Sequence, residues 1–78
     1  MSRYFFHHYD GSICIDDEGT ELASLDAARA FALRAIRDTA GHQLFDGTLH
    51  LTQRIEIAAR SGEVVGIVRF SDAVTIVG

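Results

Sequence analysis

A histidine and the only cysteine are the residues of this chain whose types and spacing best suit chemistry. His7 lies in an aromatic run that ends at Tyr9, and Cys14 lies in the run that follows Asp10-Gly11. If the two runs pair through a two-residue turn, His7 faces Cys14, and a nearby histidine can favour the thiolate that begins nucleophilic or redox chemistry. No oxyanion hole or third orienting group can be located, and cysteine is often simply buried. We therefore expect packing at Cys14 and assign no catalytic residue.

Metal coordination is the second chemistry that the residue types suggest. His7 and His8 are adjacent on a predicted strand, so they point to opposite faces and cannot bind one ion together. His42 and His50 do not stand at the spacing of a known zinc site. The acidic run at 16–18 is short, whereas calcium loops need ligands at defined intervals over about twelve residues. We expect no metal site and no cofactor.

The charge balance bears on the partners that the protein can bind. The net charge is −4, with eleven acidic residues against seven arginines and no lysine. This balance disfavours a general nucleic-acid binder, which needs a basic face for phosphates. Arg54 and Arg69 are predicted to lie opposite each other, an unfavourable pair unless Glu56 or a partner's acid relieves it. Because Phe5 and Tyr9 could stack on bases beside these arginines, an RNA-associated role stays open as an alternative.

The first element that must position these residues is a hairpin. The run Arg3–Tyr9 alternates in the manner of a strand, and Asp10-Gly11 predicts a two-residue turn into a second strand. Successive side chains of a strand point to opposite faces. One face then holds Tyr4, Phe6, His8, Ile13 and Ile15, and the other holds Phe5, His7, Tyr9 and Cys14.

A helix is predicted next in the chain. Ser24 suits the N-cap position and Leu25 the first helical residue. Apolar residues then recur at helical spacing, at Ala28, Ala32, Ile36 and Ala40. We favour a helix that continues past Gly41 to Phe45, because 44 and 45 are apolar and Asp46-Gly47 follows.

A second hairpin completes the predicted fold. Its strands are Arg54–Arg60 and Glu63–Phe70, with Ser61-Gly62 as a two-residue turn. Ala58, Val65 and Ile67 then share one face with Arg54, Glu56 and Arg69. The chain is predicted to be a single α+β domain over residues 1–78. Its element order is ββαββ, with a four-stranded antiparallel sheet in the order 2-1-3-4 and one helix packed on one face.

A single helix covers only one face of such a sheet, so the other face predicts an interaction surface. The predicted interface residues are Phe5, His7, Tyr9, Cys14, Val65, Ile67, Arg54 and Arg69. We expect a non-enzymatic protein-interaction module that forms a homodimer through this face. A regulatory partner of the antitoxin type, or one associated with nucleic acid, is the alternative. A small enzyme or metal protein built on His7 and Cys14 is the third.

Cysteine content and hydropathy predict the compartment. One cysteine permits no internal disulfide, which suits a reducing environment. No apolar stretch of the start resembles a signal peptide, and no run approaches the roughly 20 apolar residues that span a bilayer. We expect a cytoplasmic protein without a membrane segment.

Three stretches together resemble a known family. They are Arg3-Tyr4-Phe5-Phe6-His7 leading into Asp10-Gly11, the helix start Leu25-Asp26-Ala27-Ala28-Arg29, and Phe70-Ser71-Asp72-Ala73-Val74. The set resembles an uncharacterised family of short, mainly alphaproteobacterial proteins known only as a domain of unknown function. That resemblance implies a bacterial stand-alone domain and leaves its activity and any protein partner unidentified. The element order and the Leu-x-x-Ala helix start are also similar to antitoxins of the HicB type, an analogy of fold alone.

Overall fold

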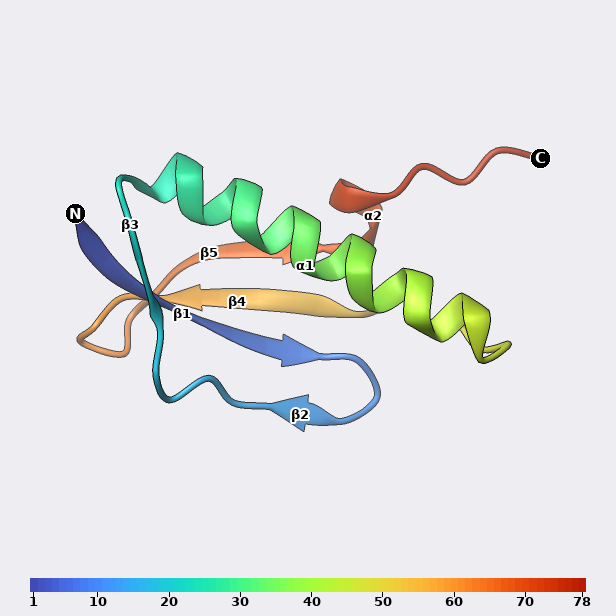
Figure 1. Cartoon of the computed structure of the whole chain (residues 1–78), viewed down its shortest axis with the longest axis horizontal. Coiled ribbons are helices and arrows are strands. Elements are labelled where there is room, and N and C mark those ends of the chain that lie inside the picture. Colours follow the sequence, from blue (N-terminus) through green and yellow to red (C-terminus); the bar gives the residue numbers. More distant parts are fainter.

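A computed structural model describes all 78 residues as an antiparallel sheet with two helices on one side (Figure 1). The elements in chain order are β1 (Ser2–Tyr9), β2 (Ile13–Cys14), β3 (Thr20–Leu22), α1 (Leu25–Phe45), β4 (Arg54–Ala58), β5 (Val64–Arg69) and α2 (Phe70–Ala73). The sheet order is β2-β1-β4-β5, and β3 also pairs with β1. The α+β class and the order of the two hairpins are confirmed. The predicted ββαββ arrangement is wrong, because the sheet has a fifth strand and the chain a second helix.

Helix α1 begins and ends where the sequence predicts. Ser24 caps it, with Oγ accepting a hydrogen bond from the Ala27 N–H at 3.1 Å, and the helix runs to Phe45. Its buried residues are Ala28, Ala32, Ile36 and Ala40. These small side chains let α1 lie close to the sheet, where Ile55, Ile57, Val68 and Phe70 complete the core. The predicted stripe is confirmed residue by residue.

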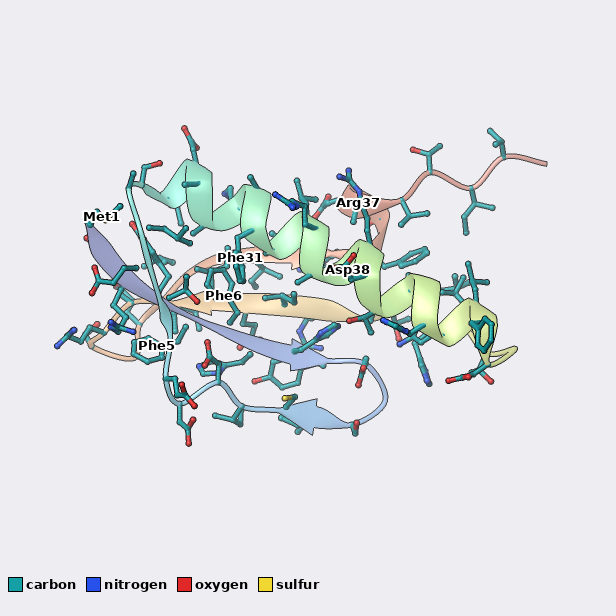
Figure 2. The ribbon with its side chains drawn as sticks, in the orientation of Figure 1. Met1, Phe5, Phe6, Phe31, Arg37 and Asp38 are labelled. Carbon is teal, nitrogen blue, oxygen red and sulfur yellow. The ribbon has the colours of Figure 1, made fainter.

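Aromatic residues secure the start of α1 against β1. Phe6 and Phe31 point toward one another, with ring centroids 4.6 Å apart (Figure 2). Phe5, the next residue of the strand, points to the opposite side of the sheet, as strand alternation requires. No helix of the protein is long and apolar enough to cross a bilayer.

The first hairpin differs from its predicted register by one residue. Tyr9 pairs with Ile13 and His8 with Cys14, so three residues, 10–12, form the loop. The Ser12 hydroxyl donates to Asp10 Oδ1 at 3.2 Å within that loop. A shift of one residue turns every side chain of a strand to the other face. The predicted pairing of His7 with Cys14 is therefore wrong, and Ile13 rather than Cys14 shares a face with Tyr9.

The second hairpin follows the predicted register until a β-bulge interrupts it. Arg54 pairs with Arg69 and Ile57 with Gly66, as predicted, but Ala58 pairs with Val64. A bulge inserts an unpaired residue and changes which face the following residues occupy. The extra residue is Val65, which packs against the core on the helix side. Its predicted place on the uncovered face is wrong.

The end of β5 also departs from the prediction. The chain turns at Phe70 into α2 instead of continuing the strand. The Asp72 carboxylate accepts a hydrogen bond from the Arg69 N–H at 2.9 Å, and Arg37 Nε donates to the Ala73 carbonyl at 2.8 Å. These contacts fix the short helix beside α1.

A single carboxylate organises the edge of β1 between β2 and β3. Asp16 Oδ2 accepts from the Phe6 N–H at 3.0 Å, and Oδ1 accepts from the N–H groups of Glu18 at 3.2 Å and Gly19 at 3.0 Å. The Asp16 N–H donates in turn to His7 Nδ1 at 3.1 Å. Burial raises the pKa of the Asp16 carboxyl, but these backbone hydrogen bonds and the nearby His7 outweigh it and hold the pKa below its ordinary value.

Replacing Asp16 by asparagine should weaken the protein in a pH-dependent way. We expect Asp16→Asn to lower the free energy of unfolding by about 1–2 kcal/mol near neutral pH, because the charged acceptor is lost. The depressed pKa stabilises the folded state above the ordinary value of 3.8, and this contribution disappears as the pH falls through the lower folded value. Urea denaturation between about pH 7 and about pH 3 should therefore show the difference from wild type shrinking in acid.

Asp17→Asn is the matched control, since Asp17 is exposed and lies next in the chain. Its effect should stay within about 0.5 kcal/mol. A similar loss in both variants, or a loss at Asp16 that does not change with pH, would contradict the role given to this carboxylate.

Candidate functional site

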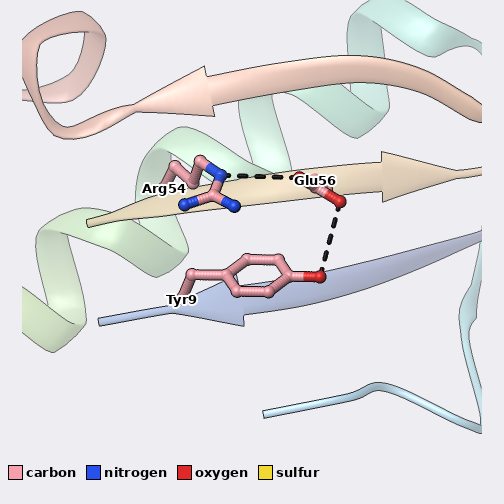
Figure 3. A network of polar contacts seen from close by, with 3 residues as sticks. All are labelled: Tyr9, Arg54 and Glu56. Atoms are coloured by element: carbon pink, nitrogen blue, oxygen red, sulfur yellow. Dashed lines mark hydrogen bonds and ion pairs between the residues drawn. The ribbon is translucent and has the colours of Figure 1, made fainter. Parts of the chain in front are cut away.

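The candidate site is the face of the sheet that neither helix covers, called here the outer face. Helix α1 packs on β3, β4 and β5, and α2 packs on α1 and β5. Figure 3 shows the sheet from its uncovered side, with the central strands β1 and β4 in front of the helix. Strand alternation and the observed registers place twelve side chains on this face. They are Arg3, Phe5, His7, Tyr9, Ile13, Glu21, Arg54, Glu56, Ala58, Val64, Ile67 and Arg69.

A polar cluster occupies the middle of the outer face (Figure 3). The Tyr9 hydroxyl donates to Glu56 Oε1 at 3.4 Å, and Arg54 Nε lies 3.4 Å from Glu56 Oε2. The Arg54 guanidinium carbon also lies 4.2 Å from the centre of the Tyr9 ring, within the range of a cation–π interaction. The three side chains therefore hold one another flat on the sheet.

The predicted conflict between two arginines is present on this face. Arg54 and Arg69 are paired across β4 and β5, and Glu56 neutralises Arg54 alone. Arg69 is exposed and forms no ion pair within the chain. The outer face thus carries one unmatched positive charge beside a satisfied cluster.

Apolar side chains surround the charged residues. Ile67 is half-buried opposite Glu56, and Ile13 is 67% exposed opposite Tyr9. Phe5 is half-buried because the chain at Gly19 approaches it so closely that an added Cβ would lie 2.9 Å from its ring. The loop between β2 and β3 therefore shields one end of the face and leaves the rest open.

The residues proposed for thiol or metal chemistry are dispersed. Cys14 is exposed and lies opposite His8, on the helix side of the sheet, while His7 accepts its hydrogen bond from Asp16. Nowhere in the structure do three side chains of histidine, cysteine or an acid lie close enough to hold a metal ion. The predicted pair of His7 with Cys14 is not formed, and the histidine that faces Cys14 is His8.

His8 belongs instead to a buried polar network at the end of the sheet. Its Nε2 lies 3.1 Å from Gln53 Oε1, an acceptor, so Nε2 carries the proton. Gln53 Nε2 donates to Gln43 Oε1 and to the His50 carbonyl, both at 2.9 Å. Gln53 is 1% exposed, and no buried side-chain polar atom lacks a partner. The network is a structural one, and it confirms His8 as a residue at the edge of the core.

Comparison with known proteins gives the family of this chain. The model of a domain of unknown function, DUF6894, matches residues 3–71. The chain belongs to this family. Searches of curated proteins and of solved structures gave no match. DUF6894 has no activity in its description, so the function has to be argued from the outer face.

Two residues of the site escaped sequence reasoning. A two-residue turn in each hairpin predicts both Ile13 and Val64 on the helix side of the sheet, whereas the observed registers place them on the outer face. The loop hydroxyl of Ser12 is the only signal for the longer first turn. Nothing in the sequence marks the bulge at Val65, since all residues around it suit a strand.

Removing the acid that pairs with Arg54 on the outer face should destabilise the fold through charge. Glu56→Gln keeps the size of the side chain but leaves Arg54 and Arg69 side by side without a carboxylate. We expect a loss of about 0.5–1 kcal/mol in the free energy of unfolding at about 0.1 M NaCl, falling at about 1 M because salt screens the repulsion. Glu63→Gln makes the same change at an exposed residue before β5 and should have no such salt-dependent effect.

Proposed function

We propose that this member of DUF6894 is a protein-interaction module that pairs with a second copy of itself through the outer face. The observation that carries the proposal is the uncovered face itself, on which apolar side chains surround a neutralised cluster and one unmatched arginine. Burying such a surface removes apolar area from water, which is the main favourable term in association. A second sheet would pack about 10 Å away, the spacing of stacked sheets.

The broad side of the molecule has more room for an interface than its edges have. The molecule measures 39 × 23 × 16 Å, with the chain after α2 included (Figure 1). A standard interface buries about 800 Å² on each partner. An interface confined to a narrow edge could not supply that area here.

The charges favour a second copy over an unrelated partner. In a two-fold pair the same patch meets itself, so residue i of one copy contacts residue j of the other and the reverse. Arg69 of one copy could then reach Glu56 of the other, which would relieve the arginine pair on both sides. The Tyr9–Arg54–Glu56 cluster supports the proposal, because side chains that already contact one another lose less freedom on binding.

Light scattering after size exclusion should find twice the mass of one chain over a range of protein concentrations. Ile13→Glu should convert this dimer to a monomer, because it places a charge in the apolar surface of the interface. Ile13 is exposed in the single chain, so the substitution should leave the fold of the monomer intact. Phe5→Glu should act in the same direction but will also cost stability, since Phe5 packs on Gly19.

Phe45→Glu is the matched control, an equal change at a residue 92% exposed at the far end of α1. It should leave the dimer intact. A wild-type protein that is monomeric throughout, or a dimer that persists in Ile13→Glu, would refute self-association through this face. A monomer that captures RNA in a salt-sensitive manner would instead support the nucleic-acid alternative.

A further inference from the structure

A groove on the helix side of the protein has the features of a ligand site. It lies between the second half of α1 and the chain after α2, and it has a volume of about 440 Å³. Ligand pockets of folded proteins cover about 300–1,000 Å³. Seven of the ten residues around it are hydrophobic, among them Leu44, Leu49, Phe70, Val74 and Ile76. The groove is remote from the outer face, so it does not depend on the proposed function.

One charged side chain stands at this apolar groove. Arg37 is the only ionisable residue among those that line it. Its Nε donates to the Ala73 carbonyl, which holds the side chain toward α2, and no carboxylate of the chain forms an ion pair with it (Figure 2). The two terminal nitrogens of the guanidinium remain as donors, and a guanidinium binds a carboxylate through two parallel hydrogen bonds.

Gly41 is independent support for a ligand in this groove. Glycine is among the least favourable residues in a helix interior, and Gly41 has no left-handed backbone that would require it. A Cβ built at Gly41 meets no atom within 4 Å, so packing inside the chain does not require a glycine either. Glycine is used where a ligand approaches the backbone closely, and Gly41 lies in the wall of the groove.

We propose that this groove binds a single-chain fatty acid, with the acyl chain along Leu44, Leu49 and Phe70 and the carboxylate on Arg37. A peptide fits less well, because the only polar side chains available to it are Arg37 and Thr75. An apolar chain with one anionic head matches both the lining and the charge. The ligand would lie against the helix at Gly41, where a side chain would exclude it.

Binding of laurate by isothermal titration calorimetry tests the head and the chain separately. Laurate should bind one to one, and decanoate should bind about tenfold more weakly because two fewer methylene groups are buried. Dodecyltrimethylammonium has the same chain with a positive head and should bind at least about tenfold more weakly than laurate. Equal binding of the two heads, or no binding of laurate, would overturn the proposal. Binding only to anionic lipid vesicles would overturn it as well.

Substitutions on α1 test the two residues that define the site. Arg37→Gln should lower laurate affinity at least about tenfold, Arg37→Lys should recover part of it, and Arg34→Gln, outside the groove, should change it less than about twofold. An unchanged affinity in Arg37→Gln, or an equal loss in both glutamine variants, would refute the role of Arg37.

Gly41→Leu should raise the stability of the protein and lower its affinity for laurate. It should raise the melting temperature by about 4–8 °C, because leucine favours the helix, and should lower laurate affinity at least about tenfold by filling the groove. Ala30→Leu places the same side chain on an exposed position of α1 away from the groove and should leave binding unchanged. A Gly41→Leu protein that binds laurate as well as wild type would refute the site.

Discussion

The hydrogen bonds around the Asp16 carboxylate are the constraint on which the rest of the fold depends. β1 is the only strand that pairs with three others, and β2 and β3 both follow it along its length. β2 and β3 run in the same direction, and between them the chain leaves β1, so that the Phe6 N–H has no strand partner. Asp16 supplies that partner through Oδ2, and its Oδ1 accepts two hydrogen bonds from the turn, so the chain reaches β3 in the position from which α1 can start. The helix, and with it the covered face, is placed by this connection.

The close approach of α1 has consequences for both sides of the sheet. Three of its four buried residues are alanines, so most of the core volume comes from Ile36 and from the strands. A narrow core uses few large side chains, and the remaining large apolar residues must lie elsewhere. Some of them, such as Ile13, lie on the outer face, and others, such as Leu44, border the groove beside α1. Both candidate surfaces therefore follow from the same thin packing layer.

The sequence predicts the parts of this fold that depend on local chemistry. The cap at Ser24, the stripe from Ala28 to Ala40 and the end at Phe45 follow from helical spacing and capping alone. Four cross-strand pairs, from Arg54↔Arg69 to Ile57↔Gly66, follow from alternation in β4 and β5. The errors of register lie where one residue more or less in a loop or strand exchanges the two faces. The Asp10–Ser12 loop moved Cys14 off the predicted interface, and the bulge moved Val65. Short elements held by tertiary contacts, β3 and α2, carry no periodicity from which they could be predicted.

The edge strands of the sheet affect whether further chains can add to it. Edge strands with free backbone groups are templates on which further chains can add. Here one edge is a strand of only two residues, β2, and at the other the last N–H of β5 is already taken by Asp72 before the chain turns away into α2. An extra strand would find few groups to pair with beside β2, and beside β5 it would have to stop where the chain turns into α2. Both features shorten the edges along which further strands could add.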